Sequence, residues 1–528
     1  MKRYLTLLLT VLTLLLTVSS CKTTSGLSSA GGKDDKHEFR GAWIQTAYQD
    51  QRYASKTPEQ CQAYLRQLVE TLYETGFNAI IFQVRPEGDA FYKSELEPWS
   101  RFLTGAQGRA PKADWDPMAY MIELCHNHGM EFHAWINPYR MYASKTWNLA
   151  SGHLYYQHPD WFVKYDDRLY LNPGLPESRA WIRDVVKDIV ARYDVDAIHM
   201  DDYFYPYPVA GQSFNDINAF QTYGPVMGFD TNQLSDLYNF RRRSVSILIK
   251  SVHDDIQQLK PWVRFGISPF GIYRNQKSWS GGSATNGTQC YDDLFADVLL
   301  WAQSGWVDYL MPQLYWEIGH TAADYKTLCD WWARSMPEGC QLYIGQSIER
   351  SLDKSSAGTL INDVTLSHSH LDNKLKQAAA SKHIQGNCYW YAYEVEDNTY
   401  HVRDYLQKSV FGGRVLPPLY AGSKKKPSAV SKLDGDLVHT KQGTALHLQW
   451  QAARPADDTH PIRFYNVYRF AKGEKVNTKN MKHLCAQVCT AEYFDYTATA
   501  SPSYTYVVTA VDSSNREGKA VKASFKLR

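Results

Sequence analysis

The chain lacks the common sequence signatures of nucleotide and metal binding. No GxGxxG or GxxxxGK[ST] loop follows any predicted strand, which argues against a nucleotide site. None of the 9 cysteines forms a CxxC pair, and no Cys/His spacing fits structural zinc. The net charge of +2 gives no electrostatic basis for binding nucleic acid or a membrane surface. We therefore expect no metal, no cofactor and no nucleic-acid partner.

Aromatic residues, by contrast, are abundant. They make up 14% of the 528 residues, with 16 Trp and 37 Tyr. A large aromatic core accounts for part of this content, but exposed rings also stack on the apolar faces of sugars. Hydrophobic residues at 44% and charged residues at 21% are ordinary for a globular protein. The length indicates more than one domain.

Residues 1–21 have the composition of a targeting signal. A basic start is followed by the apolar run Leu5–Val18, which is too short for a membrane-spanning helix. The run ends in VSSC, which resembles a bacterial lipoprotein signal with Cys21 as the lipidated first mature residue. Residues 22–37 are polar and typical of a flexible tether. By this resemblance we expect an outer-membrane lipoprotein that faces the periplasm and contacts the membrane through its lipid alone. An ordinary secreted protein with a chance cysteine is the alternative.

From residue 38 to residue 413, short apolar runs alternate with helix-length amphipathic segments. The runs that we expect to be strands are residues 40–44, 78–84, 131–137, 197–200, 264–269, 308–315, 341–347 and 386–393. The expected helices are residues 57–74, 117–127, 177–193, 234–259, 294–304, 323–334, 372–381 and 400–408, with a long loop before residue 172. Eight strand–helix repeats predict an α/β protein with a (β/α)8 TIM barrel. A doubly wound open sheet is the alternative, although it rarely needs eight successive units.

The pattern changes after the barrel. Residues 414–427 have a linker composition, with two adjacent prolines and a lysine run. Residues 428–528 contain short alternating runs such as YNVYR and YTYVVTAVD, which are typical of a β-sandwich. With Trp450, these runs resemble a fibronectin type III domain. No acids cluster in this tail, so we expect it to be dispensable for chemistry.

The fourth predicted strand ends in two adjacent carboxylates, Asp201 and Asp202. They follow an apolar run directly, and the aromatic segment YFYPYP follows them. A turn or a helix cap is the alternative, but turn-forming Gly, Asn and Ser are missing here. Because a barrel enzyme presents its catalytic groups where strands end, we predict catalytic roles for both aspartates.

Other predicted strand ends carry amides, acids, arginines and aromatic rings, a set suited to holding sugar hydroxyls and stacking on sugar faces. Arg85 and Arg140 could hold acidic substrate groups, or could ion-pair with Asp89 and the central acids. Glu317, after the sixth strand, is the candidate catalytic acid, and a solvated loop acid is the alternative. The candidate substrate-binding residues are Arg85, Asp89, Asn137, Tyr139, Arg140, Tyr203, Gln313, Tyr315, Trp316 and Tyr391.

Six motifs in fixed order resemble the glycosyl-hydrolase-like family 10, a family of bacterial barrel lipoproteins. They are EFRG with AW at residues 38–43, QVRP with GDA at 83–90, INPYR at 136–140, LNPG at 171–174, HMDDYFYP at 199–206 and MPQLYW at 311–316. The family includes an outer-membrane lipoprotein that cuts peptidoglycan glycan strands stripped of peptides. The resemblance therefore implies a periplasmic glycosidase that acts on peptidoglycan glycan or a related polysaccharide.

Two other functions remain open at this point. The first is a non-catalytic glycan-binding lipoprotein that uses the same cleft. The second is a barrel enzyme of other chemistry, such as a metal-dependent deacetylase, although the sequence offers no clear His/Asp ligand cluster.

Two mechanisms also remain open. Asp201 and Asp202 are neighbours on an extended segment, so their side chains should point to opposite sides. One of their pKa values should rise unless an arginine intervenes. Hydrolysis could use two carboxylates with Glu317 as the acid, or the aspartate pair could polarise a substrate acetamide that attacks the bond.

Overall fold

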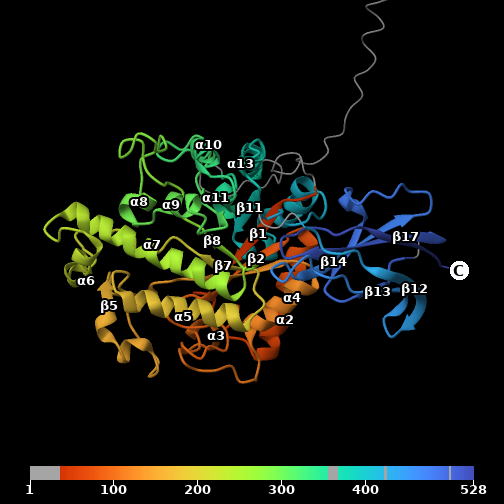
Figure 1. The fold of residues 1–528 in the computed structure, drawn as a ribbon, viewed down its shortest axis with the longest axis horizontal. Coiled ribbons are helices and arrows are strands. Elements are labelled where there is room, and N and C mark those ends of the chain that lie inside the picture. Colours follow the sequence, from red (N-terminus) through yellow and green to blue (C-terminus); the bar gives the residue numbers. More distant parts are fainter. Residues whose placement is uncertain (1–35, 355–366, 421–424, 499–500, 528) are drawn as a thin grey trace, which may run out of the picture.

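The computed structural model describes residues 36–354, 367–420, 425–498 and 501–527. These residues form a closed eight-stranded barrel followed by two antiparallel sheets, which confirms the predicted fold class (Figure 1). The predicted signal, Cys21 and nearly all of the predicted tether lie outside the described residues.

The barrel is parallel throughout and closes between its first and last strands, so the alternative of an open sheet is wrong. The strands expected at residues 264–269 and 308–315 are shorter, because Pro269 and Pro312 have no N–H to donate to a neighbouring strand. The strand expected at residues 386–393 ends at Trp390, because a short helix begins at Ala392. The barrel strands are β1 (Phe39–Ile44), β2 (Ala79–Arg85), β3 (Glu131–Ile136), β7 (Ala197–Met200), β8 (Arg264–Ile267), β9 (Tyr309–Leu310), β10 (Gln341–Ser347) and β11 (Gly386–Trp390).

The helices begin and end at the signals that the sequence carries. Thr57 caps the first long helix in a capping box, Pro58 opens it, and Gly76 ends it with a left-handed φ of 113°. The longer helices are α2 (Pro58–Thr75), α4 (Pro117–Asn127), α5 (Pro176–Arg192), α7 (Leu234–Leu259), α10 (Tyr325–Ser335) and α13 (Ser369–Ala379). The shorter ones are α3 (Arg101–Thr104), α6 (Ile217–Tyr223), α8 (Cys290–Asp293), α9 (Val298–Gln303), α11 (Ile348–Ser351), α14 (Ala392–Glu396) and α15 (Val402–Tyr405).

Two expected elements differ in the structure. The helix predicted over residues 400–408 is divided into a 3-10 turn at Thr399–His401, then α15, then a π-helical turn at Leu406–Phe411. The predicted loop before residue 172 contains a small antiparallel sheet of β4 (Arg140–Tyr142), β6 (Arg168–Leu171) and β5 (Phe162–Tyr165). Asp166 and Asp167 join β5 to β6 with φ of 48° and 59°. Two left-handed residues form the tight turn that hairpins favour.

Aromatic side chains fill the interior of the barrel. Phe39, Trp43, Trp135, Tyr309 and Tyr343 form one buried cluster with the small residues between them. Glycine is required at position 266 on β8, because a Cβ there would lie 1.9 Å from Cζ of Tyr309. The interior is therefore a packed core, not a channel, and a substrate can reach only its ends.

The tail forms a three-stranded and a four-stranded antiparallel sheet with an apolar core between them, called the sandwich below. One sheet has the order β12 (Ser431–Thr440), β13 (Gly443–Gln451) and β16 (Glu492–Asp495). The other has the order β15 (Leu484–Val488), β14 (Ile462–Ala471), β17 (Ser503–Asp512) and β18 (Val521–Lys526).

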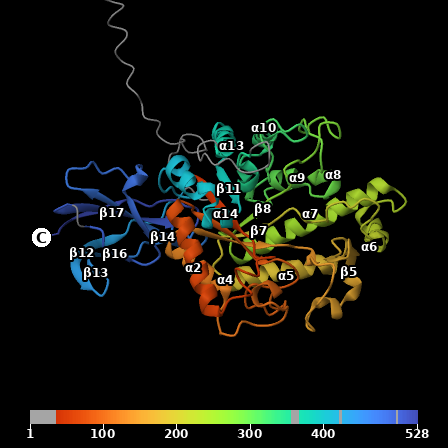
Figure 2. The same ribbon diagram turned by 180° about the vertical axis from the view of Figure 1, so that it is seen from behind.

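The sandwich is docked on the amino end of the barrel, beside α2 and α4 (Figures 1 and 2). Arg463 forms an ion pair with Asp196, which immediately precedes β7. Asn515 Nδ2 donates to Oε1 of Glu131, the first residue of β3, over 3.0 Å. Within the predicted linker, Val415–Pro418 are buried. The carboxyl end of the barrel is left as its open end.

Three further properties concern the described residues alone. All eight cysteines from Cys61 to Cys489 are free thiols. No group of three or more His, Cys, Asp or Glu side chains could hold a metal ion in the described ranges. None of the helices seen in these ranges combines the length and apolarity needed to cross a membrane.

Candidate active site

Asp201 and Asp202 lie at the carboxyl end of β7, each with only 3% of its surface exposed. Asp201 Oδ2 accepts a hydrogen bond from Trp135 Nε1 over 3.2 Å. Asp202 Oδ1 accepts from Gln313 Nε2 over 3.3 Å, and its Oδ2 accepts from the Tyr207 hydroxyl. The two carboxylates thus turn toward opposite neighbours, Asp201 toward β3 and Asp202 toward the segment after β9, as the extended backbone predicts.

Burial stabilises the protonated form of each of these two carboxyl groups relative to its ionised form. It raises the pKa of Asp201 to about 7, with a further rise from the charge of Asp202. Burial also raises the pKa of Asp202, although hydrogen bonds from Tyr207 and Gln313 oppose the rise. Arg140 lowers both pKa values but forms no ion pair with either aspartate; its Nη2 donates to the Pro86 carbonyl over 3.0 Å. One carboxyl of the pair can therefore hold a proton near neutral pH while the other is ionised.

Half-exposed aromatic rings form a row that leads outward from Asp202. Tyr203 lies edge to face with Tyr207, with ring centroids 5.7 Å apart. Tyr207 meets Phe270 at 5.9 Å, and Phe270 meets Trp316 at 5.5 Å. Rings held in this way by their neighbours can stack on sugar faces with little loss of conformational entropy.

Three indoles form the floor of the site at the top of the barrel core. Trp390 is half-exposed and lies edge to face with Trp43 at 6.3 Å and with Trp135 at 6.2 Å. Tyr391 stacks on Trp390 at 5.2 Å and is also half-exposed. This floor includes Trp135, the indole that donates to Asp201.

Three of the predicted substrate-binding residues are buried away from the mouth. Arg85 is fully buried and forms a two-pronged ion pair with Glu97, at 2.6 Å and 2.7 Å, instead of the expected pairs with Asp89 or the central acids. Asp89 is equally buried and accepts from Gln107 Nε2 over 3.2 Å. Tyr139 is 1% exposed. Arg85 and Asp89 thus bond to residues that follow β2, and a substrate-binding role for these three residues stays a prediction.

Asn137 is as buried as these residues, and its amide resembles the Tyr139 hydroxyl in lacking a hydrogen-bond partner among the described residues. It ends the β3 segment two residues beyond Trp135, and neither its Nδ2 nor its Oδ1 has a hydrogen-bond partner within the described part of the chain. A buried amide without a partner is rare and needs an explanation. Its place at a strand end suits a contact with a substrate hydroxyl.

Glu317 stands apart from the aspartate pair. It is exposed on the loop before α10. Burial lowers the pKa of Lys374, on α13, to about 7, and the negative charge of Glu317 opposes this lowering. Tyr315 and Trp316, from the same segment, are half-exposed near the mouth. The structure brings Gln313 to Asp202 but shows no hydrogen bond between Glu317 and either aspartate.

Trp135, Tyr207 and Trp390 are site residues that the sequence analysis did not select. A signal existed for Trp135, because Glu131, His133 and Trp135 alternate with apolar residues and so share one face of β3. Tyr207 lies in the aromatic loop, where nothing in the sequence distinguishes it from Tyr203 or Tyr205.

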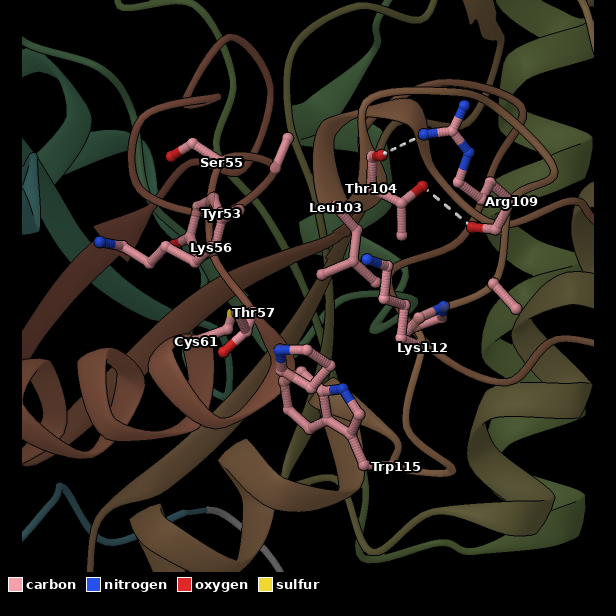
Figure 3. A pocket seen from close by; sticks show the side chains of 14 residues that line it. Tyr53, Ser55, Lys56, Thr57, Cys61, Leu103, Thr104, Arg109, Lys112 and Trp115 are labelled. Carbon is pink, nitrogen blue, oxygen red and sulfur yellow. Dashed lines mark hydrogen bonds between the residues drawn. The ribbon is translucent and has the colours of Figure 1, made fainter.

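A separate basic hollow lies between the loops that follow β1 and β2, which are also loops of the carboxyl end. It has a volume of about 340 Å³. Figure 3 shows Lys56 on one side, Arg109 and Lys112 on the other, and Trp115 below. Ser55, Thr57 and Thr104 add hydroxyl groups, and no Asp or Glu is among the lining residues. We call this feature the basic hollow.

A parallel barrel with two buried carboxylates at the carboxyl ends of its strands and aromatic rings around them defines a carbohydrate-active type of site. Comparison with known proteins agrees with this class. The family model described as Glycosyl hydrolase-like 10 matches residues 38–357, and the chain belongs to this family.

Two relatives match this chain over most of their own length. The chain is 35% identical to Glycosyl hydrolase YngK of Bacillus subtilis over 514 residues, which cover 94% of this chain and 95% of that protein. It is 34% identical to Glycosyl hydrolase DigH of Escherichia coli over 363 residues, covering 63% of this chain and 80% of the relative. The first match therefore includes the sandwich, whereas the second, over 363 residues, is slightly shorter than the barrel region of residues 38–413.

Solved structures are much more distant. An α-L-fucosidase isoenzyme 2 from Paenibacillus thiaminolyticus aligns with a TM-score of 0.44 and 13% identity, over 70% of this chain and 49% of that one. The PgaB (BpsB) glycoside hydrolase domain of Bordetella bronchiseptica gives 0.42 and 11%, over 71% and 99%. At this distance the likeness says nothing about chemistry.

Proposed function

We propose that this protein is a glycoside hydrolase that cleaves glycosidic bonds in peptidoglycan glycan strands or in a related polysaccharide. The observation that carries the proposal is the buried pair of Asp201 and Asp202 at the open end of the barrel. Glycosidic cleavage needs one carboxyl that donates a proton and a second group that stabilises or attacks the anomeric carbon. A pair in which one member stays protonated near neutrality provides the first requirement.

Asp201 is the proposed proton donor. Its pKa of about 7 leaves about half of the molecules protonated at neutral pH, so Asp201 can protonate the leaving oxygen. Asp202, held by Tyr207 and Gln313, is the proposed ionised partner. On an N-acetylated sugar this partner would orient the substrate acetamide for attack, which is the second of the two mechanisms left open by the sequence. Glu317, the acid of the first mechanism, is exposed and lies near Lys374, which favours the adjacent pair.

The surroundings of the pair support a sugar polymer as substrate. The row from Tyr203 to Trp316 offers rings to successive sugar units. The basic hollow supports an acidic polymer, because its three cationic side chains have no acidic partner among the lining residues. Peptidoglycan glycan carries a carboxylate on every second sugar, so it has both properties.

The proposed location is the periplasmic face of the outer membrane, with lipid on Cys21. Small residues directly before that cysteine support this location. Cys21→Ala should abolish labelling with radioactive palmitate and release the protein from the membrane fraction. Membrane partition that survives this change would contradict the anchor.

The deciding experiment is the release of reducing ends from purified glycan strands. The chain without residues 1–21 should release them from strands freed of peptides, and the Asp201→Asn/Asp202→Asn double variant should not. If the wild type binds glycan but releases no reducing ends, the protein is a glycan-binding lipoprotein, and the fibronectin type III-like sandwich would then need testing as a second binding site.

A further inference from the structure

A chain of buried hydrogen bonds runs along the barrel axis from the docked sandwich toward the active site. It begins at Glu131, whose Oε1 accepts from Asn515 of the sandwich and lies 2.8 Å from Arg264 Nη2. His133 Nε2 lies 3.0 Å from Glu131 Oε2. His133 Nδ1 lies 2.8 Å from the hydroxyl of Tyr309. These residues come from β3, β8 and β9 and meet in the centre of the barrel.

The chain continues upward through His199 on β7. Its Nδ1 lies 3.0 Å from the Tyr309 hydroxyl. Its Nε2 lies 3.0 Å from Ser268 Oγ and 3.3 Å from Trp43 Nε1. His133, His199 and Tyr309 are all 0% exposed, so solvent cannot replace any of these partners. We call Glu131, His133, Tyr309 and His199 the relay.

The lower end of the relay fixes the direction of every hydrogen bond. Burial alone would raise the pKa of Glu131, but Arg264 and His133 hold it well below its usual range, so the carboxylate only accepts. His133 must then donate from Nε2. Burial lowers the pKa of His133, so the ring is neutral and its Nδ1 accepts from the Tyr309 hydroxyl. The Tyr309 oxygen is left to accept from His199 Nδ1.

The upper end requires the same direction independently. The indole of Trp43 can only donate, so His199 Nε2 must accept. Burial lowers the pKa of His199 well below its usual value, so the ring is neutral and Nδ1 carries its single proton. Nδ1 then donates to Tyr309, as the lower end demands. Both ends thus select one arrangement of protons out of the two that a Tyr–His chain can adopt.

We propose that the relay is a positioning device for the active site, a proposal that rests on the glycosidase function above. It holds His199 as the Nδ1–H tautomer, and the free Nε2 lone pair fixes the Trp43 indole and the Ser268 hydroxyl. The ionised carboxylate of Glu131, held in place partly by the sandwich, selects this tautomer from the amino end, and the Trp43 indole selects it from the other end.

Two routes connect the upper end of the relay to the aspartate pair. Trp43 packs on Trp390, which packs on Trp135, whose indole donates to Asp201. On the other side, Gln313 Nε2 donates both to the Ser268 carbonyl, over 3.0 Å, and to Asp202. A relay that set the wrong tautomer would present an N–H to the Trp43 N–H, and two donors would face each other in a dry core.

The most direct test is the tautomer of each imidazole in the full chain, read from long-range ¹H–¹⁵N NMR spectra. His133→Gln and His199→Gln identify the two signals by their loss. We expect Nε2–H for His133 and Nδ1–H for His199 at pH 7. Glu131→Gln removes the charge without changing the shape and leaves only Trp43 to select the tautomer, so the His199 signal should shift in part toward the other tautomer. A wild-type His199 that is Nε2–H or doubly protonated would overturn the relay.

A kinetic test separates positioning from packing. Tyr309→Phe keeps the ring and removes the shared hydroxyl, and it should lower kcat about tenfold with KM little changed, the scale of losing an orienting partner. Tyr343→Phe is the matched control, because its ring lies in the same cluster while its hydroxyl bonds to Gln341 and Tyr420 and to neither relay histidine. Equal kcat in both folded variants would contradict the proposal. If the wild type cleaves no glycan, the proposed function fails, and the NMR tautomers alone still decide the relay.

Discussion

At the amino end of the barrel, Glu131 is buried beside Arg264, whereas at the carboxyl end Asp201 and Asp202 are equally buried without an ion pair. Burial is therefore not what distinguishes the two ends. The paired arginine holds the pKa of Glu131 below its usual range, while the pKa of Asp201 rises to about 7.

This difference separates a structural carboxylate from a reactive one. At the amino end, Glu131 is satisfied by a guanidinium group and by the sandwich, so it remains ionised and fixes the architecture. The carboxyl end places Arg140 nearby but bonded to a carbonyl, so one of its acids retains a proton. Five predictions test or sharpen the contrast, beginning with the largest expected effect.

Removing the reactive carboxylates should abolish turnover and leave the fold intact. Asp201→Asn and Asp202→Asn should each lower kcat by about a hundredfold or more, the scale of lost acid–base catalysis. Reducing-end assays measure this loss, and circular dichroism verifies the fold. Near-normal turnover in both variants would place the active site elsewhere.

Breaking an ion pair at the amino end should have the opposite effect. Arg463→Leu leaves Asp196 buried with its hydrogen bond from the Phe132 amide but without its cation, and should lower the free energy of unfolding by about 3 kcal/mol. Turnover per folded molecule should remain normal.

Urea unfolding curves measure the change, and Arg183→Leu is the matched control. Arg183 pairs with Asp255 at 2.7 Å but is 38% exposed, so its loss should matter by less than about 1 kcal/mol. Equal destabilisation by the two substitutions would show that the docked interface is no stronger than an ordinary surface pair.

The raised pKa of Asp201 predicts how stability and turnover depend on pH. An unfolded aspartate ionises near pH 3.9, so the native state should lose stability as pH rises from about 4 to about 7, by up to a few kcal/mol. Asp201→Asn should remove this loss and be more stable than the wild type at pH 8. Turnover of the wild type should fall as pH rises through about 7, because the donor loses its proton. A flat stability difference between the two proteins from pH 4 to pH 8 would contradict the assigned pKa.

Glu317 offers a test of which carboxylates react. Because it is exposed and lies near Lys374, Glu317→Gln should change kcat by less than about tenfold, well below the loss of an acid–base catalyst. A hundredfold loss would restore Glu317 as the catalytic acid and remove that role from Asp201.

The smallest expected effect concerns the basic hollow. Lys112→Gln should raise KM a few-fold for carboxylated glycan and leave neutral oligosaccharides unchanged, since an exposed charge contributes less than about 1 kcal/mol. Lys441→Gln, an exposed lysine in the turn between β12 and β13, is the matched control. An equal change for neutral and carboxylated substrates would argue against recognition of charge.

The sequence predicted the features that depend on local pattern. Eight apolar runs separated by amphipathic helices are readable without tertiary information, and so is an acid pair that directly follows an apolar run. The β4–β6 sheet was missed because its strands are only three or four residues long. The helix start at Thr57 and its stop at Gly76 were correct because capping is local.

Features that depend on which strands become neighbours could not be predicted. From the sequence, Arg85 could form an ion pair with Asp89 or with Glu97. Only the folded loop shows that Glu97 is its partner. The relay joins residues of three strands, β3, β7 and β9, through their register. The linker composition of residues 414–427 gave no sign that Val415–Pro418 would be buried beside the barrel.

The chain enters and leaves the barrel at the same place. The Glu38 amide donates to the Leu416 carbonyl over 2.9 Å, and the Leu416 amide donates to the Lys36 carbonyl over 2.9 Å. Any segment that precedes Lys36 therefore starts from the amino end, on the opposite side of the barrel from Asp201.

If Cys21 is lipidated as proposed, the membrane attachment lies on the amino-end side of the barrel, and the mouth faces away from the membrane. The largest distance between the membrane and the barrel is then set by the length of residues 22–35, which at full extension reach roughly 50 Å. Shortening that segment should limit which layers of a polymer network the enzyme can reach without altering its turnover on soluble chains.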